Sequence, residues 1–320
     1  MGLISDLKPI NFLEEKERFL SNPTFNPQFR YLKIIHEQEL TKHGLPNEKY
    51  IPLAQKIIEQ TFHDFTAQEL AAEQGQLLSQ KEVNNKLVDF LKKHNNLDKK
   101  YRIIWAEDFV SRTAINADTI KLRFPCSVHE EDLDGLIYHE LGTHALRRVN
   151  YEQQPWFKKK NKYGFSSYLK TEEGLAVLHS IYPKKYLLAY TAAINFLATI
   201  KAQTSSFLEV WQFINHYVED HEKAFNLTFK KKRGLTDTSQ PGGLTKDYVY
   251  FEGFVETTRF LIDNNFPIKE LYFGKLAYQD INKAVELNKN FKPLLPDFYA
   301  ENPVRYRNRV VEIAKANFLV

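Results

Sequence analysis

The stretch LIYHELGTHALRRVN (residues 136–150) places two histidines and a glutamate within six residues. A His-Glu pair followed by a second His on one helix is the zinc-binding pattern of many metallopeptidases, in which the histidines are four residues apart. Here His139 and His144 are five residues apart. The stretch is therefore either a metal site with one additional residue or a helix with two unrelated histidines.

The spacing makes a structural prediction. Each residue of an α-helix turns about 100°, so side chains four apart diverge by about 40° and side chains five apart by about 140°. His139 and His144 can reach one ion only where the helix is unwound, bulged or ending. Gly142 weakens a helix, and the Thr143 hydroxyl can bond a backbone carbonyl. A π-bulge, with hydrogen bonds from i to i+5, would realign the histidines, so we predict a bulged or broken helix.

By chance alone the pattern is unusual but not rare, and its context favours the metal site. The chain has ten histidines, of which four precede a glutamate, and of these four only His139 has a second histidine five residues later. The pair also follows the alternating stretch ADTIKLRFP (117–125), which predicts a half-buried strand at a sheet edge with Ile120, Leu122 and Phe124 inward. A strand edge beside a helix with metal ligands favours a peptide-binding metal site.

The composition excludes several other classes of protein. The 320 residues are 43% hydrophobic, which is enough for a packed core. A single cysteine, Cys126, excludes a disulfide framework and a cysteine-rich structural zinc site. The net charge of +4 does not argue for nucleic acid, and no apolar run reaches the roughly 20 residues that span a membrane. The N-terminal residues lack the apolar run of a signal peptide, so we expect a cytoplasmic protein.

Periodicity predicts a mainly helical α+β fold with a small central sheet. Residues 11–93 are expected to be mostly helical, KKYRIIWAED (99–108) to form a strand, and KKKRGLTDTSQPGG (230–243) to form a loop. Further helices are expected at 130–150, 171–182, 184–203, 205–218, 246–264 and 301–318. We expect one domain over residues 1–320, with a helical N-terminal part (1–98) and a remainder (99–320) that carries the metal site.

A catalytic zinc site usually needs a third protein ligand. The strongest downstream candidate is KTEEGLAVLHSI, in which Glu172 and Glu173 open an apolar helix. Gly174 and Ala176 would let that helix pack closely on another. The alternative is that both acids only complement the helix dipole at its N-terminus.

Four motifs, taken in order, resemble a known family: HELGTH, NYEQQPW, TEEGLAVLHS and GGLTKDYVYFEG, with NPQFRY (26–31) preceding them. Together they resemble the microtubule-associated tyrosine carboxypeptidases. Bacterial relatives are labelled by a Gln-Glu-Gly-Leu-Cys motif and by modulated expression of flavohemoglobin. The resemblance implies a zincin-like zinc metallopeptidase, and in the eukaryotic members it implies removal of the C-terminal tyrosine of α-tubulin.

The resemblance also implies roles for individual residues. His139 and His144 match the family's zinc ligands, and Glu140 matches its general base. The Glu that precedes Gly in the bacterial label aligns with Glu173, so Glu173 is expected to be the third ligand. The label's Gln is Glu172 here and its Cys is Ala176. The chain lacks a long polar extension that would serve microtubule binding, so tubulin is implied by the family alone.

A carboxypeptidase needs a cation for the terminal carboxylate, and arginine has the best geometry for it. The loop after residue 230 offers Lys231, Lys232, Arg233 and Lys246, and the helix that carries the two histidines ends with Arg147 and Arg148. Of these, Arg233 or Lys246 is expected to bind the carboxylate. Tyr248 and Tyr250 are candidate oxyanion donors. The expected partner is the C-terminal tail of a peptide or protein, and an acidic tail would suit the lysine runs; neither nucleic acid nor membrane is expected.

The expected reaction is therefore the zinc-dependent removal of a C-terminal residue, tyrosine or another aromatic. Two alternatives stay open at this point. One is a zincin-fold regulatory or binding protein without peptidase activity, against which Glu140 argues because metal binding alone does not need it. The other is an endopeptidase or aminopeptidase that uses the same site.

Overall fold

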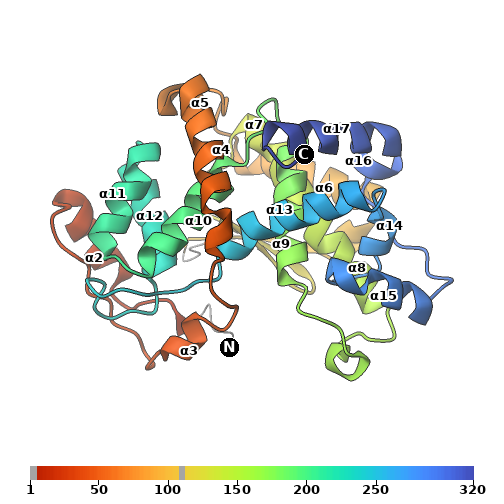
Figure 1. Ribbon diagram of the computed structural model, residues 1–320, viewed down its shortest axis with the longest axis horizontal. Coiled ribbons are helices and arrows are strands. Elements are labelled where there is room, and N and C mark those ends of the chain that lie inside the picture. The colour runs from red at the N-terminus through yellow and green to blue at the C-terminus, as the bar shows by residue number, and fades with distance from the viewer. Residues whose placement is uncertain (1–5, 108–111) are drawn as a thin grey trace. The chain divides into compact units, whose positions relative to one another are not determined.

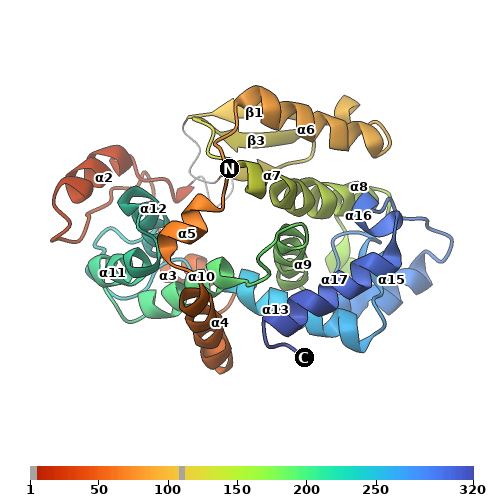
Figure 2. The same ribbon diagram turned by 90° about the horizontal axis from the view of Figure 1, so that it is seen from above.

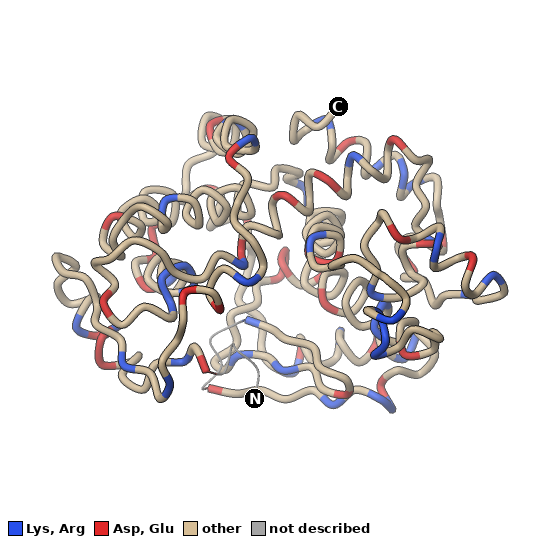
Figure 3. Tube along the Cα trace, turned by 60° about the horizontal axis from the view of Figure 1, so that its bottom comes forward, with Lys and Arg blue, Asp and Glu red and all other residues tan. Residues whose placement is uncertain are grey.

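The computed structural model describes residues 6–107 and 112–320. The chain divides into two compact units, of which unit 1 comprises Met1–Ala71 and Tyr190–Phe251 and unit 2 comprises Ala72–Ala189 and Glu252–Val320. Figure 3 shows that basic and acidic residues are interspersed along the whole trace, in keeping with the small net charge of +4. The single catalytic domain over 1–320 stays a prediction.

Unit 1 is helical. Phenylalanine side chains from α2 and α12 meet in its core, where the rings of Phe12 and Phe229 are 4.7 Å apart and those of Phe19 and Phe225 are 5.4 Å apart. Helices α4 and α10 pack against each other, as do α11 and α12 (Figure 1). The elements are α2 (Phe12–Ser21), α3 (Glu37–Leu40), η1 (Glu48–Tyr50), α4 (Ile51–Asp64), α5 (Ala67–Ala72), α10 (Tyr190–Ala202), α11 (Phe207–Tyr217) and α12 (His221–Lys232).

The lysine run that was expected to open a loop is instead the end of helix α12. Lys231 and Lys232 are fully buried. The Lys231 ammonium pairs with Asp247 and donates to Asn195 Oδ1 at 2.8 Å. Lys232 donates to the carbonyls of Ser205 at 2.7 Å and Gln240 at 2.6 Å. The loop prediction is thus wrong for residues 230–232, because internal carbonyls and a carboxylate satisfy charges that would otherwise need water.

Unit 2 carries the sheet and most of its helices. Figure 2 shows β1, β3 and α6 in one layer, with α7 and α8 in the layer below. Its elements are α6 (Gln80–Lys93), η2 (Leu97–Lys99), β1 (Arg102–Ala106), β2 (Thr113–Ile115), β3 (Thr119–Arg123), α7 (Glu130–Ile137), η3 (Tyr138–Ala145), α8 (Leu146–Glu152), η4 (Lys160–Tyr163), α9 (Leu169–Ile181), α14 (Ile268–Leu271), η5 (Tyr278–Asp280), α15 (Ile281–Leu287), α16 (Asp297–Ala300) and α17 (Pro303–Ala316). Helix α13 (Tyr248–Asp263) begins in unit 1 and continues in unit 2.

The three-stranded sheet has the order β1-β3-β2. Strand β3 pairs in parallel with β1 and in antiparallel with β2. The prediction that 117–125 forms a sheet edge is therefore wrong: β3 is the central strand, and the short β2 takes the edge on the side of the metal-site helix. Ile120 and Leu122 are buried as predicted, whereas Phe124 lies beyond the strand and is 39% exposed.

The mainly helical α+β fold with a small sheet is confirmed. The expected helices are present with ends shifted by a few residues; the largest shift is at α10, which begins at Tyr190 instead of 184. Among the residues that the structure describes, no helix combines the length and apolar character that a membrane crossing requires.

Candidate metal centre

The metal-site helix runs through α7, η3 and α8, and its middle segment η3 is π-helical. The π segment spans Tyr138–Ala145 and contains both histidines. The imidazole centroids of His139 and His144 are 5.0 Å apart, with ring planes at 80°. Bonding from i to i+5 brings residues five apart onto one helical face. The predicted bulge is confirmed, and the additional residue between the histidines is accommodated in the π segment.

A buried hydrogen-bond network holds the π segment. The Thr143 hydroxyl donates to the Tyr138 carbonyl at 2.9 Å and lies 2.7 Å from His179 Nδ1. His179 Nε2 lies 2.8 Å from the Tyr306 hydroxyl. Burial, and then the charge of Arg147, lower the pKa of His179 well below its usual value, so the ring is neutral. Because the Thr143 proton is already donated, Nδ1–H donates to Thr143 and Nε2 accepts from Tyr306.

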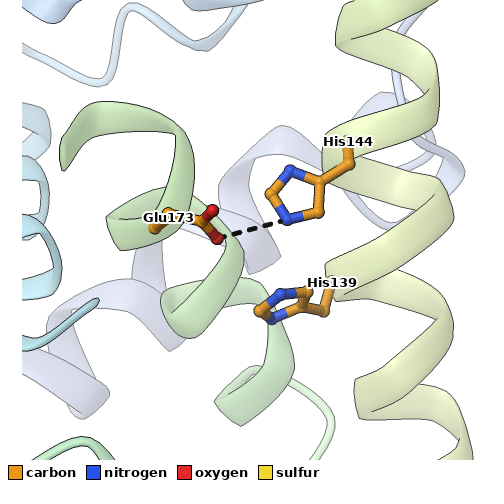
Figure 4. A group of neighbouring side chains, drawn as sticks. All are labelled: His139, His144 and Glu173. Carbon is orange, nitrogen blue, oxygen red and sulfur yellow. Dashed lines mark ion pairs between the residues drawn. The ribbon is translucent and has the colours of Figure 1, made fainter. Parts of the chain in front are cut away.

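The third member of the group comes from α9, which packs against η3. Figure 4 shows His139 and His144 projecting from one helix toward Glu173 on its neighbour. One donor atom from each of the three residues lies within 4.8 Å of the other two. His144 Nε2 and Glu173 Oε2 are 3.4 Å apart. Two ligand atoms of a tetrahedral zinc ion are about 3.3–3.6 Å apart, so the spacing of the His144–Glu173 pair, and the chemistry of all three donors, fit such an ion.

A glycine contact fixes the position of Glu173. A Cβ on Gly174 would lie 2.0 Å from the carbonyl carbon of Gly253 on α13. A Cβ on Gly253 would lie 2.1 Å from the Lys170 carbonyl oxygen. Figure 1 shows α9 and α13 side by side. The helices can approach this closely only with glycine at both positions, and Glu173 is adjacent to the contact.

Glu172 holds His144 from the other side. Glu172 Oε1 lies 2.8 Å from His144 Nδ1, and the carboxylate also pairs with Arg147 and, at 2.7 Å, with Lys275. Burial opposes ionisation of Glu172, but the charges of Lys275 and Arg147 keep its pKa well below the usual value. A carboxylate on the second nitrogen of a metal-binding histidine fixes the ring's orientation and tautomer.

The two carboxylates favour a positive charge at His144. Burial lowers the pKa of this imidazole, but the hydrogen bonds and charges of Glu172 and Glu173 outweigh burial and raise it to about 9. The same two carboxylates would stabilise a divalent cation bound at His144 Nε2. Metal binding there displaces a proton, since a ligating imidazole is neutral.

Sequence reasoning missed the role of Glu172 and of the basic residues around it. Arg147 was one of several cations considered for the substrate carboxylate, but its side chain is fully buried. It donates to Glu172 and to the carbonyls of Leu271, Gly274 and Leu276. The sequence did carry one signal for this role: Arg147 stands on an otherwise apolar helix, one turn after the candidate ligand His144. Lys275 carried no such signal, because it lies 103 positions after Glu172 in the sequence.

Glu140 is 8% exposed and lies next to the first histidine on the π segment. The Thr113 hydroxyl, from edge strand β2, donates to Glu140 Oε1. Burial lowers the pKa of His139, and the charge of Glu140 opposes this effect. A carboxylate oriented by one hydrogen bond and placed beside the donor cluster is suited to accept a proton.

The four predicted substrate-binding residues lie in unit 1, whereas the donor cluster lies in unit 2. Arg233 is 8% exposed, and its Nε has no hydrogen-bond partner in the described part of the chain. Lys246 and Tyr250 are half-buried. Tyr248 is buried, and its hydroxyl donates to the His43 carbonyl. Their role in substrate binding stays a prediction.

The fold and the site together define a mainly helical α+β protein with a metallopeptidase-like group of two histidines and a glutamate. Comparison with known proteins identifies the family. Residues 36–303 match the family model described as "Microtubule-associated tyrosine carboxypeptidase", and the chain belongs to this family.

Curated relatives align over nearly the whole chain. The chain is 31% identical over 326 residues to the mouse protein named "Putative tyrosine carboxypeptidase MATCAP2", covering 99% of this chain and 62% of the relative. It is 30% identical over 321 residues to human "Microtubule-associated tyrosine carboxypeptidase 1", covering 98% of this chain and 68% of the relative. The chain thus spans about three fifths to two thirds of the length of these relatives.

Proposed function

We propose that this chain is a zincin-like, zinc-dependent metallo-carboxypeptidase that removes a C-terminal tyrosine or another aromatic residue from a polypeptide. The observation that carries the proposal is the group of His139, His144 and Glu173, with Glu140 adjacent, in a member of a family named for this activity. Glu140 favours an enzyme over a binding module, since a structural metal site does not need a fourth, proton-accepting group.

His139, His144 and Glu173 would hold the metal, and Glu172 would keep His144 Nε2 directed at it. When bound, a zinc ion supplies Lewis acidity at the scissile carbonyl and makes water a stronger acid. Glu140 accepts the proton of the attacking water and later passes it to the leaving amine. Thr113 orients the Glu140 carboxylate through Oε1, which leaves Oε2 for the proton.

Substrate recognition is part of the proposal. A cation would bind the terminal carboxylate, for which Arg233 and Lys246 are the candidates from sequence, and Tyr248 or Tyr250 would donate to the oxyanion. The Tyr248 hydroxyl would first have to exchange its bond to the His43 carbonyl. The human relative is named as microtubule-associated, which supports a protein C-terminal tail as substrate and a cytoplasmic location.

Substitution of Glu140 by glutamine tests the proposal. Glu140→Gln is nearly isosteric and leaves the three donor residues in place, so it should retain zinc. It should lower the release of tyrosine from a peptide by about 100- to 10,000-fold, the usual contribution of a general base. Glu131→Gln, an exposed glutamate on α7, is the matched control and should be fully active. Full activity of Glu140→Gln would exclude Glu140 as the base.

A further inference from the structure

Three charged side chains lie together beside the N-terminal part of the metal-site helix. Arg112 precedes edge strand β2, Asp132 lies on α7, and Lys184 follows α9. Arg112 Nη1 lies 3.5 Å from Asp132 Oδ2, and Lys184 Nζ lies 2.6 Å from Asp132 Oδ1. Asp132 precedes His139 by seven residues, or about two turns, so both lie on one helical face, about 10 Å apart along the axis.

The backbone holds both cations in place. The Arg112 carbonyl accepts a hydrogen bond from the Arg123 N–H at 3.0 Å, which ties Arg112 to strand β3. The next residue, Thr113, is tied to Glu140. Lys184 crosses α7 at Gly135, where a Cβ would lie 3.4 Å from Lys184 Cε and 2.5 Å from the Ser180 carbonyl. Gly135 therefore leaves the room that brings Lys184 to Asp132.

The charged group around Asp132 faces solvent. Among the residues that the structure describes, two cations of this group share one carboxylate, which gives the group a net positive charge. The side chains of Arg112 and Lys184 are 43% and 37% exposed. The comparable group around Glu172 is closed, because Arg147 is 0% exposed there and Glu172 is 3% exposed. That group holds His144, whereas the group around Asp132 is open to an anionic ligand.

Arg112 is also near the donor cluster. The residue after Arg112 is Thr113, which bonds Glu140, and Glu140 is adjacent to His139 on the π segment. The contact of Arg112 with Asp132 is long, and an exposed ion pair of this kind contributes little to stability. A ligand carboxylate can therefore replace Asp132 as the partner of Arg112 at little cost.

We propose that Arg112, together with Lys184, binds the carboxylate of the substrate's C-terminal residue and so restricts cleavage to the last peptide bond. This inference rests on the proposed carboxypeptidase function. One extended residue spans about 3.5 Å, so a carboxylate held between His139 and Asp132 leaves room for one residue beyond the scissile bond. The arginine fork matches a carboxylate in two hydrogen bonds. Arg112 belongs to the same unit as the donor cluster and is exposed, whereas Arg233 is buried in unit 1.

Substitution of Arg112 tests the assignment on two peptides that end in tyrosine, one with a free carboxylate and one amidated. Wild type should cleave the free peptide and spare the amidated one. Arg112→Ala should raise KM for the free peptide about 10- to 100-fold, the equivalent of one hydrogen bond to a charged group, with a smaller effect on kcat. Arg112→Lys should raise KM by a smaller factor than Arg112→Ala, because lysine keeps the positive charge but cannot form the two parallel hydrogen bonds of a guanidinium.

Arg102→Ala is the matched control. Arg102 lies on β1, at the opposite edge of the same sheet, and its guanidinium pairs with Asp118 at 3.2 Å in an exposed position. This variant should behave as wild type, and all variants should bind zinc as wild type does, which verifies folding. The assignment of Arg112 would be overturned if Arg112→Ala had the wild-type KM while wild type cleaved only the free peptide. That result would leave the carboxypeptidase proposal intact. Absence of cleavage by wild type would overturn both.

Discussion

Thr143→Val tests what holds the π segment. Valine has nearly the shape of threonine but no hydroxyl, so the change removes the bond to the Tyr138 carbonyl and leaves the His179 Nδ1–H without its acceptor. Thr143 and His179 are both 0% exposed, so water cannot replace either bond. One lost hydrogen bond costs about 1 kcal/mol and a buried donor left unsatisfied about 1–3 kcal/mol. We therefore expect the free energy of unfolding to fall by about 2–4 kcal/mol.

The assay is urea unfolding followed by circular dichroism, with zinc affinity measured on the same samples. Thr143→Ser keeps the hydroxyl and should recover most of the loss, the remainder being the missing methyl group. His179→Leu removes the hydrogen-bond partner of Thr143. In that variant, Thr143→Val should therefore lower the free energy of unfolding clearly less than it does in wild type. A loss below about 0.5 kcal/mol in Thr143→Val, or equal losses on the two backgrounds, would refute the role of this network.

Three further predictions concern the site's supports and unit 1. Glu172→Gln should weaken zinc binding about 10- to 100-fold in equilibrium dialysis, because it removes the charge that orients His144; unchanged affinity would contradict that role. Gly174→Ala should lower the free energy of unfolding by about 1–3 kcal/mol through its clash with Gly253, and a neutral result in thermal unfolding would disprove the close helix contact. Burial opposes ionisation of Asp247, but the charges of Lys231 and Arg233 lower its pKa from 3.8 to about 2. The folded pKa is the lower one, so this stabilisation is complete above pH 3.8 and is lost as the pH falls toward about 2. The stability gap between wild type and Asp247→Asn should shrink by about 2 kcal/mol over that range, and a constant gap would contradict the pairing.

The π segment could be predicted from sequence because a spacing of five has few geometric solutions. His139 and His144 cannot share an ion on a regular α-helix, and Gly142 with Thr143 marks where the helix departs from regularity. The choice of Glu173 over Glu172 could not be made from spacing, since both open the same helix. It depended on the family resemblance, and the structure places a Glu173 oxygen at the donor cluster and Glu172 against the other nitrogen of His144.

Long-range pairing accounts for most of what sequence reasoning missed. Strand β3 was expected at an edge because β2 is only three residues long, too short to give a periodic signal. Lys231 and Lys232 were expected in a solvated loop, because nothing local shows that Asp247 and distant carbonyls would satisfy them. Arg112 was not singled out either, since its proximity to the metal-site helix arises from the pairing of β2 with β3.

The central claim is tested most directly by wild-type protein loaded with one equivalent of zinc and incubated with a peptide that ends in tyrosine. Mass spectrometry should show loss of that single residue, dependent on the metal and absent when the C-terminus is amidated. An unchanged free peptide in the presence of bound zinc, or a cut at an internal bond, would contradict the assignment of this site to a carboxypeptidase.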